Sequence, residues 1–186
     1  MTRYLLLPLC MLALNAMTVD AQSRYFTDQG NVTFFSDAPL EDITASSNEL
    51  RAILDTKTGK IIAKLRIRSF DFKKELMEEH FNENYLESDQ YPEAVFRGQL
   101  KGLSGKDIKE EQPLTFPVKG DITIHGVIRS IEDSVQIVFD GDIIQGKATF
   151  NLKPKSFDIK IPTIVIKKIA EVVEVNVDMM LEPIKE

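Results

Sequence analysis

The sequence has little cysteine, no tryptophan and no surplus of basic residues. Its single cysteine, Cys10, lies among the first residues, and Lys and Arg number 23 against 29 Asp and Glu. A chain without further thiols forms no disulfide and offers no thiolate metal ligand, so residues 22–186 must be held together by burial. The basic residues occur only in short doublets. We therefore expect no nucleic acid partner, which would require a basic face for the phosphate backbone.

The first residues have the pattern of a secretory signal peptide. Arg3 precedes an apolar stretch over residues 4–14, and small and polar residues follow up to Ala21. This pattern predicts cleavage after residue 21 and export of residues 22–186 to the periplasm or out of the cell. The alternative is a retained membrane anchor, but the apolar stretch is shorter than the ~20 residues that a spanning helix needs. Residues 22–186 have the length of one ordinary domain, with no expected membrane span.

Apolar and polar residues alternate along most of the remaining chain, which is typical of strands with one buried face. The clearest run covers residues 114–128, where we expect one long strand with Ile128 on its apolar face and His125 on its polar face. Residues 55–59 predict a hairpin turn between two strands. The expected strands fall near residues 32–35, 50–54, 61–67, 94–101, 114–128, 135–139, 148–152, 157–167 and 173–181.

Long antiparallel strands with one apolar face favour a closed barrel over a small sandwich. A single helical segment is expected near residues 72–86. The predicted fold is all-β: an antiparallel, lipocalin-like β-barrel of about eight strands with one helical insertion. Gly98, Gly120 and Gly126 fall on the expected apolar faces. They indicate either sharp bends of the barrel wall or space left for a ligand.

Several motifs follow one another in a characteristic order. They are Ser69-Phe70-Asp71-Phe72, a helix with Met77 and His80, Tyr91-Pro92-Glu93-Ala94-Val95-Phe96, the stretch 119–127, and Ser156-Phe157-Asp158-Ile159. Together they resemble the YceI-like family of exported polyisoprenoid-binding proteins over almost all of residues 22–186. The resemblance implies a barrel around an elongated apolar cavity. It also implies a lipid ligand such as a polyisoprenoid, an isoprenoid quinone or a fatty amide.

The candidate ligand-binding residues are inward apolar side chains of the expected strands and one face of the helix. An eight-stranded barrel has room either to be filled by side chains or to hold one small ligand. Burial of an apolar chain contributes roughly 0.8 kcal/mol per CH2, so a long ligand needs no polar anchor. The expected cavity residues are Met77, His80, Phe81, Phe96, Phe116, Ile122, Ile124, Phe139, Phe150 and Val175.

The two histidines are the main candidates for chemistry. The alternation places His125 on the surface, whereas His80 lies on the helix face that also carries Met77 and Phe81. His80 could pack, contact a ligand head group, or take part in catalysis or metal binding. A second inward histidine is missing, residues 104–106 resemble only a hairpin tip, and residues 140–142 resemble only a turn. We therefore expect no catalytic site, no metal and no cofactor.

The sequence thus favours an exported, non-enzymatic carrier of an apolar ligand. One alternative is an enzyme that acts on a lipid or quinone in the same cavity. Another is a filled barrel that serves as a stress or interaction module without cargo. The oligomeric state stays open, a homodimer included.

Overall fold

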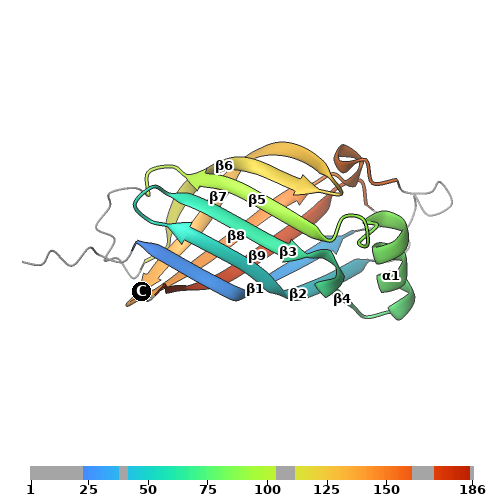
Figure 1. The fold of residues 1–186 in the computed structure, drawn as a ribbon, viewed down its shortest axis with the longest axis horizontal. Coiled ribbons are helices and arrows are strands. Elements are labelled where there is room, and N and C mark those ends of the chain that lie inside the picture. The colour runs from blue at the N-terminus through green and yellow to red at the C-terminus, as the bar shows by residue number, and fades with distance from the viewer. Residues whose placement is uncertain (1–22, 38–41, 104–111, 161–169, 185–186) are drawn as a thin grey trace, which may run out of the picture.

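The computed structural model describes residues 23–37, 42–103, 112–160 and 170–184, so the expected signal peptide lies outside the described residues. Within these ranges, each strand of the barrel pairs with its neighbour in sequence, and the first also pairs with the last. This closed antiparallel ring (Figure 1) confirms the predicted lipocalin-like barrel. Its eight strands are β1 (Arg24–Ser36), β2 (Ile43–Asp55), β3 (Lys60–Arg66), β5 (Glu93–Leu100), β6 (Leu114–Ile124), β7 (Val127–Asp140), β8 (Ile143–Leu152) and β9 (Val173–Pro183).

The turn between β2 and β3 is the expected hairpin. The Asp55 side chain accepts hydrogen bonds from the backbone N–H groups of Lys57 at 2.9 Å and Thr58 at 3.1 Å. Gly59 has a φ of +70°, a left-handed conformation that glycine adopts without strain. These local features fix the register of the hairpin and place Leu54, which is fully buried, inside the barrel.

The prediction of one strand over residues 114–128 is wrong at its end. His125 and Gly126 have φ values of +50° and +72° and form a two-residue turn between β6 and β7. Such a turn places the residues on either side of it on the same face, whereas a continuous strand would place them on opposite faces. Ile128 therefore points outward and is 61% exposed. Alternation in the sequence cannot reveal this reversal.

The expected strand near residues 157–167 is also wrong where it can be compared with the structure. Phe157 ends the short 3-10 helix η3 (Pro154–Phe157), and residues 161–169 lie outside the described residues. Pro154 favours a helical first turn, and Asp158, with a φ of +56°, ends it in a left-handed conformation. The Phe157 side chain consequently turns into the barrel end and is only 2% exposed.

The helical insertion is shorter than predicted. Helix α1 (Glu75–His80) continues directly into a single π-helical segment, η2 (Phe81–Tyr85). Phe72, which was expected in the helix, belongs to the two-residue strand β4 (Asp71–Phe72), which pairs with β2 and follows the 3-10 helix η1 (Ile67–Ser69). Figure 1 shows α1 at the end of the barrel opposite the C-terminus. No helix in the described ranges has the length and apolar character needed to cross a bilayer.

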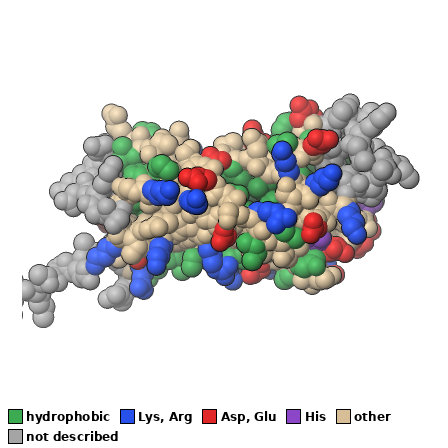
Figure 2. All heavy atoms as spheres, turned by 90° about the horizontal axis from the view of Figure 1, so that it is seen from above, with side chains coloured by type: hydrophobic (Ala, Val, Ile, Leu, Met, Phe, Trp, Pro, Cys, Tyr) green, Lys and Arg blue, Asp and Glu red, His purple; other side chains and the backbone are tan. Residues whose placement is uncertain are grey.

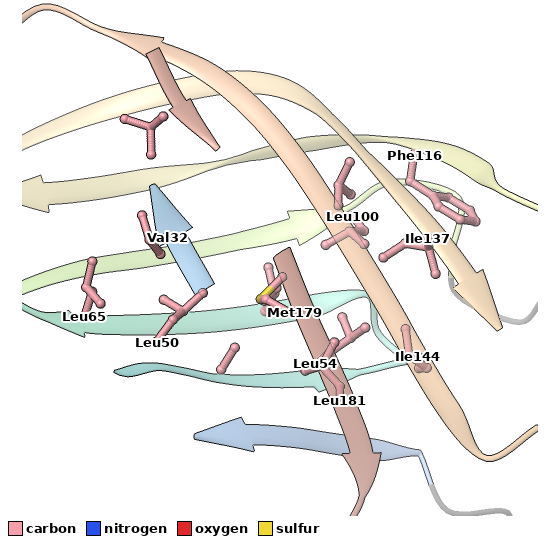
Figure 3. Packing of buried hydrophobic residues seen from close by; sticks show 14 of the residues in the cluster. Val32, Leu50, Leu54, Leu65, Leu100, Phe116, Ile137, Ile144, Met179 and Leu181 are labelled. Carbon is pink, nitrogen blue, oxygen red and sulfur yellow. The ribbon is translucent and has the colours of Figure 1, made fainter. Parts of the chain in front are cut away.

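The core fills the end of the barrel away from α1. Leu54, Leu100, Ile137, Ile144 and Leu181 come from five different strands and are at most 2% exposed. Figure 3 shows these side chains converging inside the ring. Burial of this apolar surface, roughly 1.5–3 kcal/mol for each such side chain, holds the barrel closed here. Space for a ligand must therefore lie nearer to the helix.

Candidate functional site

The barrel encloses a cavity of about 530 Å³, which lies within the range of known small-molecule pockets. Every strand of the ring contributes lining side chains, and these are almost all aliphatic or aromatic. The packed core forms the floor, including Leu54, Leu100, Ile137 and Leu181. On the side of the barrel drawn in Figure 2, basic and acidic side chains are interspersed.

An aromatic cluster attaches the helical insertion to the barrel. The Phe81 ring stacks on Phe34 with a centroid distance of 5.6 Å and lies 5.0 Å from Phe72. Phe70 completes the group, with centroids 5.2 Å from Phe34 and 5.6 Å from Phe81. Such pairs contribute about 0.5–1.5 kcal/mol each beyond the area they bury. All four rings also line the cavity, so the same residues fix the helix and form the cavity roof.

The structure places eight of the ten expected ligand-binding residues on the cavity wall: Met77, His80, Phe81, Phe96, Ile122, Ile124, Phe150 and Val175. Phe116 and Phe139 do not border this cavity. Phe116 lies in the core and is 3% exposed, and Phe139 packs against that core beside the turn between β7 and β8. Alternation assigns a side chain to a face of the strand but not to a depth along the barrel axis. Ligand contact by the eight wall residues stays a prediction.

His80 lies at the rim of the cavity. It borders the cavity together with Leu76, which is 60% exposed, while the side chains of Met77 and Phe81 on the same helical segment lie deeper. The imidazole is exposed, and within the described residues it makes no hydrogen bond or ion pair. It is therefore available to a ligand head group and is not needed to hold the helix.

His125 is not the surface residue that the alternation predicted, because its side chain is only 10% exposed. Its Nε2 lies 2.7 Å from Glu87 Oε2, its Nδ1 lies 3.1 Å from the Phe157 carbonyl oxygen, and its ring packs edge-on against Tyr91. Both oxygens are acceptors, so both contacts are hydrogen bonds only when the imidazole is protonated. His125 thus joins η3 and the loop after η2 to the turn between β6 and β7. The tolerance of histidine for a positive φ, next to a glycine, was the one signal for this turn.

Gly98 and Gly120 face each other on β5 and β6, and the space above them holds the ring of Phe96. A Cβ atom built on Gly120 would lie 2.8 Å from Phe96 Cε2 and 2.5 Å from the Gly98 Cα atom. The space left by the missing side chains of the two glycines is therefore occupied by the Phe96 ring and not by a ligand. Gly126, the third glycine expected on an apolar face, lies in the turn beside Tyr91.

Few polar groups border the cavity, and sequence reasoning identified only His80 among them. The others include Lys74, Tyr85, Asp133 and Ser134. Burial raises the pKa of Tyr85 above its ordinary value. Residues 140–142 form the expected turn, while residues 104–106 lie outside the described residues. Within the described ranges, no group of three or more His, Cys, Asp or Glu side chains could hold a metal ion.

A closed antiparallel barrel around an apolar cavity places the chain among the lipocalin-like barrels. The model of the YceI-like domain matches residues 17–181, and the chain belongs to this family. Among solved structures, a polyisoprenoid binding domain from Saccharophagus degradans is 13% identical with a TM-score of 0.76, covering 88% of this chain and 99% of that one.

Two further structures share the fold. Burkholderia cenocepacia BcnA is 15% identical with a TM-score of 0.67, covering 82% of this chain and 95% of its own. A YCEI protein from Campylobacter jejuni is 14% identical with a TM-score of 0.54, and the match covers 100% of both chains. The comparison with curated proteins gave no match.

Proposed function

We propose that the protein is an exported, non-enzymatic carrier that encloses an elongated apolar molecule in its barrel. The observation that carries the proposal is the cavity of about 530 Å³ with its almost wholly apolar wall. Each CH2 group moved from water into such a cavity contributes roughly 0.8 kcal/mol. The ligand class is a polyisoprenoid, an isoprenoid quinone or a fatty amide. The structural likeness to a polyisoprenoid binding domain supports this choice.

The cavity also bears on the alternatives. A filled barrel that acts only as an interaction module would not leave this space beside its core. An enzyme acting on a lipid or quinone would need a group placed to transfer a proton or attack the ligand. His80 is the candidate for that role, and within the described residues it has no partner that would activate or orient it.

Native mass spectrometry of protein purified from a lipid-rich host tests the proposal. We expect a reproducible bound mass in the range of an isoprenoid or fatty chain, and a mature chain that begins at Gln22. Ala63→Phe should reduce the bound fraction, because Ala63 lines the cavity. Ile62→Phe is the matched control, because the adjacent Ile62 is 46% exposed on the outer face. A ligand-free protein, or equal binding by both variants, would overturn the proposal.

His80→Ala separates the carrier from an enzyme. Since His80 is exposed at the cavity rim, we expect this variant to keep the fold and to change ligand affinity only modestly. An enzyme would lose turnover of a bound lipid or quinone while it retained binding. Thermal unfolding, ligand titration and mass analysis of the bound molecule before and after incubation distinguish these outcomes.

A further inference from the structure

The barrel wall separates between β7 and β8. Strands β6 and β7 pair continuously from Leu114 and Ile137 to the turn between them, and β8 pairs with β9 from Ile144 to Leu152. In contrast, β7 and β8 pair only over residues 136–140 and 143–147. The first nine residues of β7 (127–135) and the last five of β8 (148–152) are therefore not paired with each other.

A second separation in the ring, between β2 and β3, is different. These strands pair only over residues 51–55 and 60–64, but β4 pairs with β2 beyond that point and occupies the space. Between β7 and β8, the described residues provide η3 and Ile159 just after it, and η3 packs against β7 near the open end. Its Phe157 carbonyl oxygen is held there by His125 at 3.1 Å. The middle of this separation is left without a covering strand among the described residues.

Among the described residues, nothing closes this separation, and the cavity reaches the outside there. Asp133 and Ser134 both border the cavity although they are neighbours on one strand, and both are exposed. Asp133 shares the inward face of β7 with Ile131 and Val135, yet it is exposed, so solvent reaches the inner face of the wall beside it. Phe150 and Leu152, on the other side of the separation, line the same cavity. This opening is distinct from the rim beside α1, where His80 lies.

Asp133 brings a negative charge to this opening. It pairs with Val118 on the inward face of the wall, between Ile131 and Val135. Its carboxylate accepts a hydrogen bond from the Ser134 N–H at 2.8 Å, and it forms no ion pair within the described residues. The adjacent Glu132 points outward and lies 3.2 Å from the Lys119 ammonium group, so that lysine is engaged on the other face. A carboxylate at an otherwise apolar wall favours hydrogen-bond donors and cations.

We infer that the opening between β7 and β8 is a head-group site, where Asp133 binds the amine, amide or hydroxyl end of a ligand whose chain lies in the cavity. The inference rests on the proposed function, because it concerns the same cavity. It adds a selection rule: donor head groups bind more tightly than carboxylates of the same chain length. Carboxylates are rejected because two like charges would meet at Asp133.

The test is a titration of delipidated protein at neutral pH with hexadecylamine, hexadecanamide, hexadecanol and hexadecanoic acid. An exposed ion pair changes affinity by about two- to fivefold, and the acid is also repelled, so the amine should bind at least about fivefold more tightly than the acid. Asp133→Asn should bring this ratio close to one. Glu132→Gln removes the same charge one residue away, on the outer face, and should leave the ratio unchanged.

Three results would overturn the inference. They are equal binding of amine and acid by the wild-type protein, an unchanged ratio in Asp133→Asn, and the same loss of selectivity in Glu132→Gln. Each of these leaves the carrier function standing, because the chains still bind. If none of the four compounds binds, the proposed function fails and the inference fails with it. Circular dichroism of each variant confirms that differences in binding do not come from unfolding.

Discussion

Substitution of Gly120 by alanine tests how tightly the wall is packed above the cavity. Gly120 pairs with Gly98, and the ring of Phe96 lies over both residues. The added methyl group would lie 2.8 Å from the ring and 2.5 Å from the Gly98 Cα atom, and closer still to the Arg97 carbonyl oxygen. Two of these three contacts are with backbone, which cannot move aside without separating β5 from β6.

The expected cost follows from two opposing effects. Forcing extra atoms into a packed site costs about 1–3 kcal/mol, while replacing glycine by alanine inside a strand gains about 0.5–1 kcal/mol. Gly120→Ala should therefore lower the free energy of unfolding by up to about 2.5 kcal/mol. Displacement of Phe96 would also push its ring into the cavity, so ligand binding should weaken as well.

Gly146→Ala is the matched control. Gly146 is a buried strand residue, but its added methyl group would meet only the Met179 and Ile137 side-chain ends, at 3.3 and 3.5 Å. Because a flexible methionine can adjust, this variant should lie between no change and a gain of about 1 kcal/mol. Urea unfolding followed by circular dichroism measures both. If Gly120→Ala proves as stable as Gly146→Ala, the close approach of β5 and β6 is not what requires glycine.

Other residues allow shorter tests. Burial, and then the nearby Asp142 carboxylate, raise the pKa of Tyr25 in the folded protein, so the unfolded chain loses this proton first and the free energy of unfolding falls as the pH rises above about 10. In urea unfolding, Tyr25→Phe should make this fall with pH less steep. The same slope in both proteins would show that Tyr25 does not cause the fall. In His125→Gln, the side chain cannot donate to both the Glu87 carboxylate and the Phe157 carbonyl oxygen in the same geometry. Amide hydrogen exchange should therefore become faster in the loop around Glu87 and in η3. Unchanged protection would show that these two hydrogen bonds are dispensable. Leu181→Ala should cost about 2–5 kcal/mol, because Leu181 is fully buried in the core; a cost under about 1 kcal/mol would show loose packing there.

The barrel architecture could be predicted from the sequence because the barrel wall has one polar and one apolar face, which produces alternation along each strand. Ile122 and Ile124 were assigned to the interior from alternation alone, and they are buried there. The same rule failed where the chain reverses within two residues, at His125. It also could not separate Phe116 in the core from Phe96 on the cavity wall, because depth along the barrel depends on strand tilt and register.

The opening between β7 and β8 escaped prediction for a related reason. The expected strand began at residue 135, whereas β7 begins at Val127. Glu132, Asp133 and Ser134 interrupt the apolar pattern, and a charged residue at an inward position resembles the end of a strand. A polar residue can interrupt the apolar alternation either because it lies in a loop or because the wall is open beside it. The sequence alone does not distinguish these two cases, since they differ only in strand pairing.

The closure of the ring by β1 and β9 has a consequence for the order in which the protein can be made. Phe34 pairs with Ala45 on one side and with Val175 on the other, although Val175 is synthesised 141 residues later. Until β9 has been synthesised, both β1 and β8 present unpaired backbone edges, and the interior stays open to water. The chain can therefore reach its final fold only when nearly all of it is present.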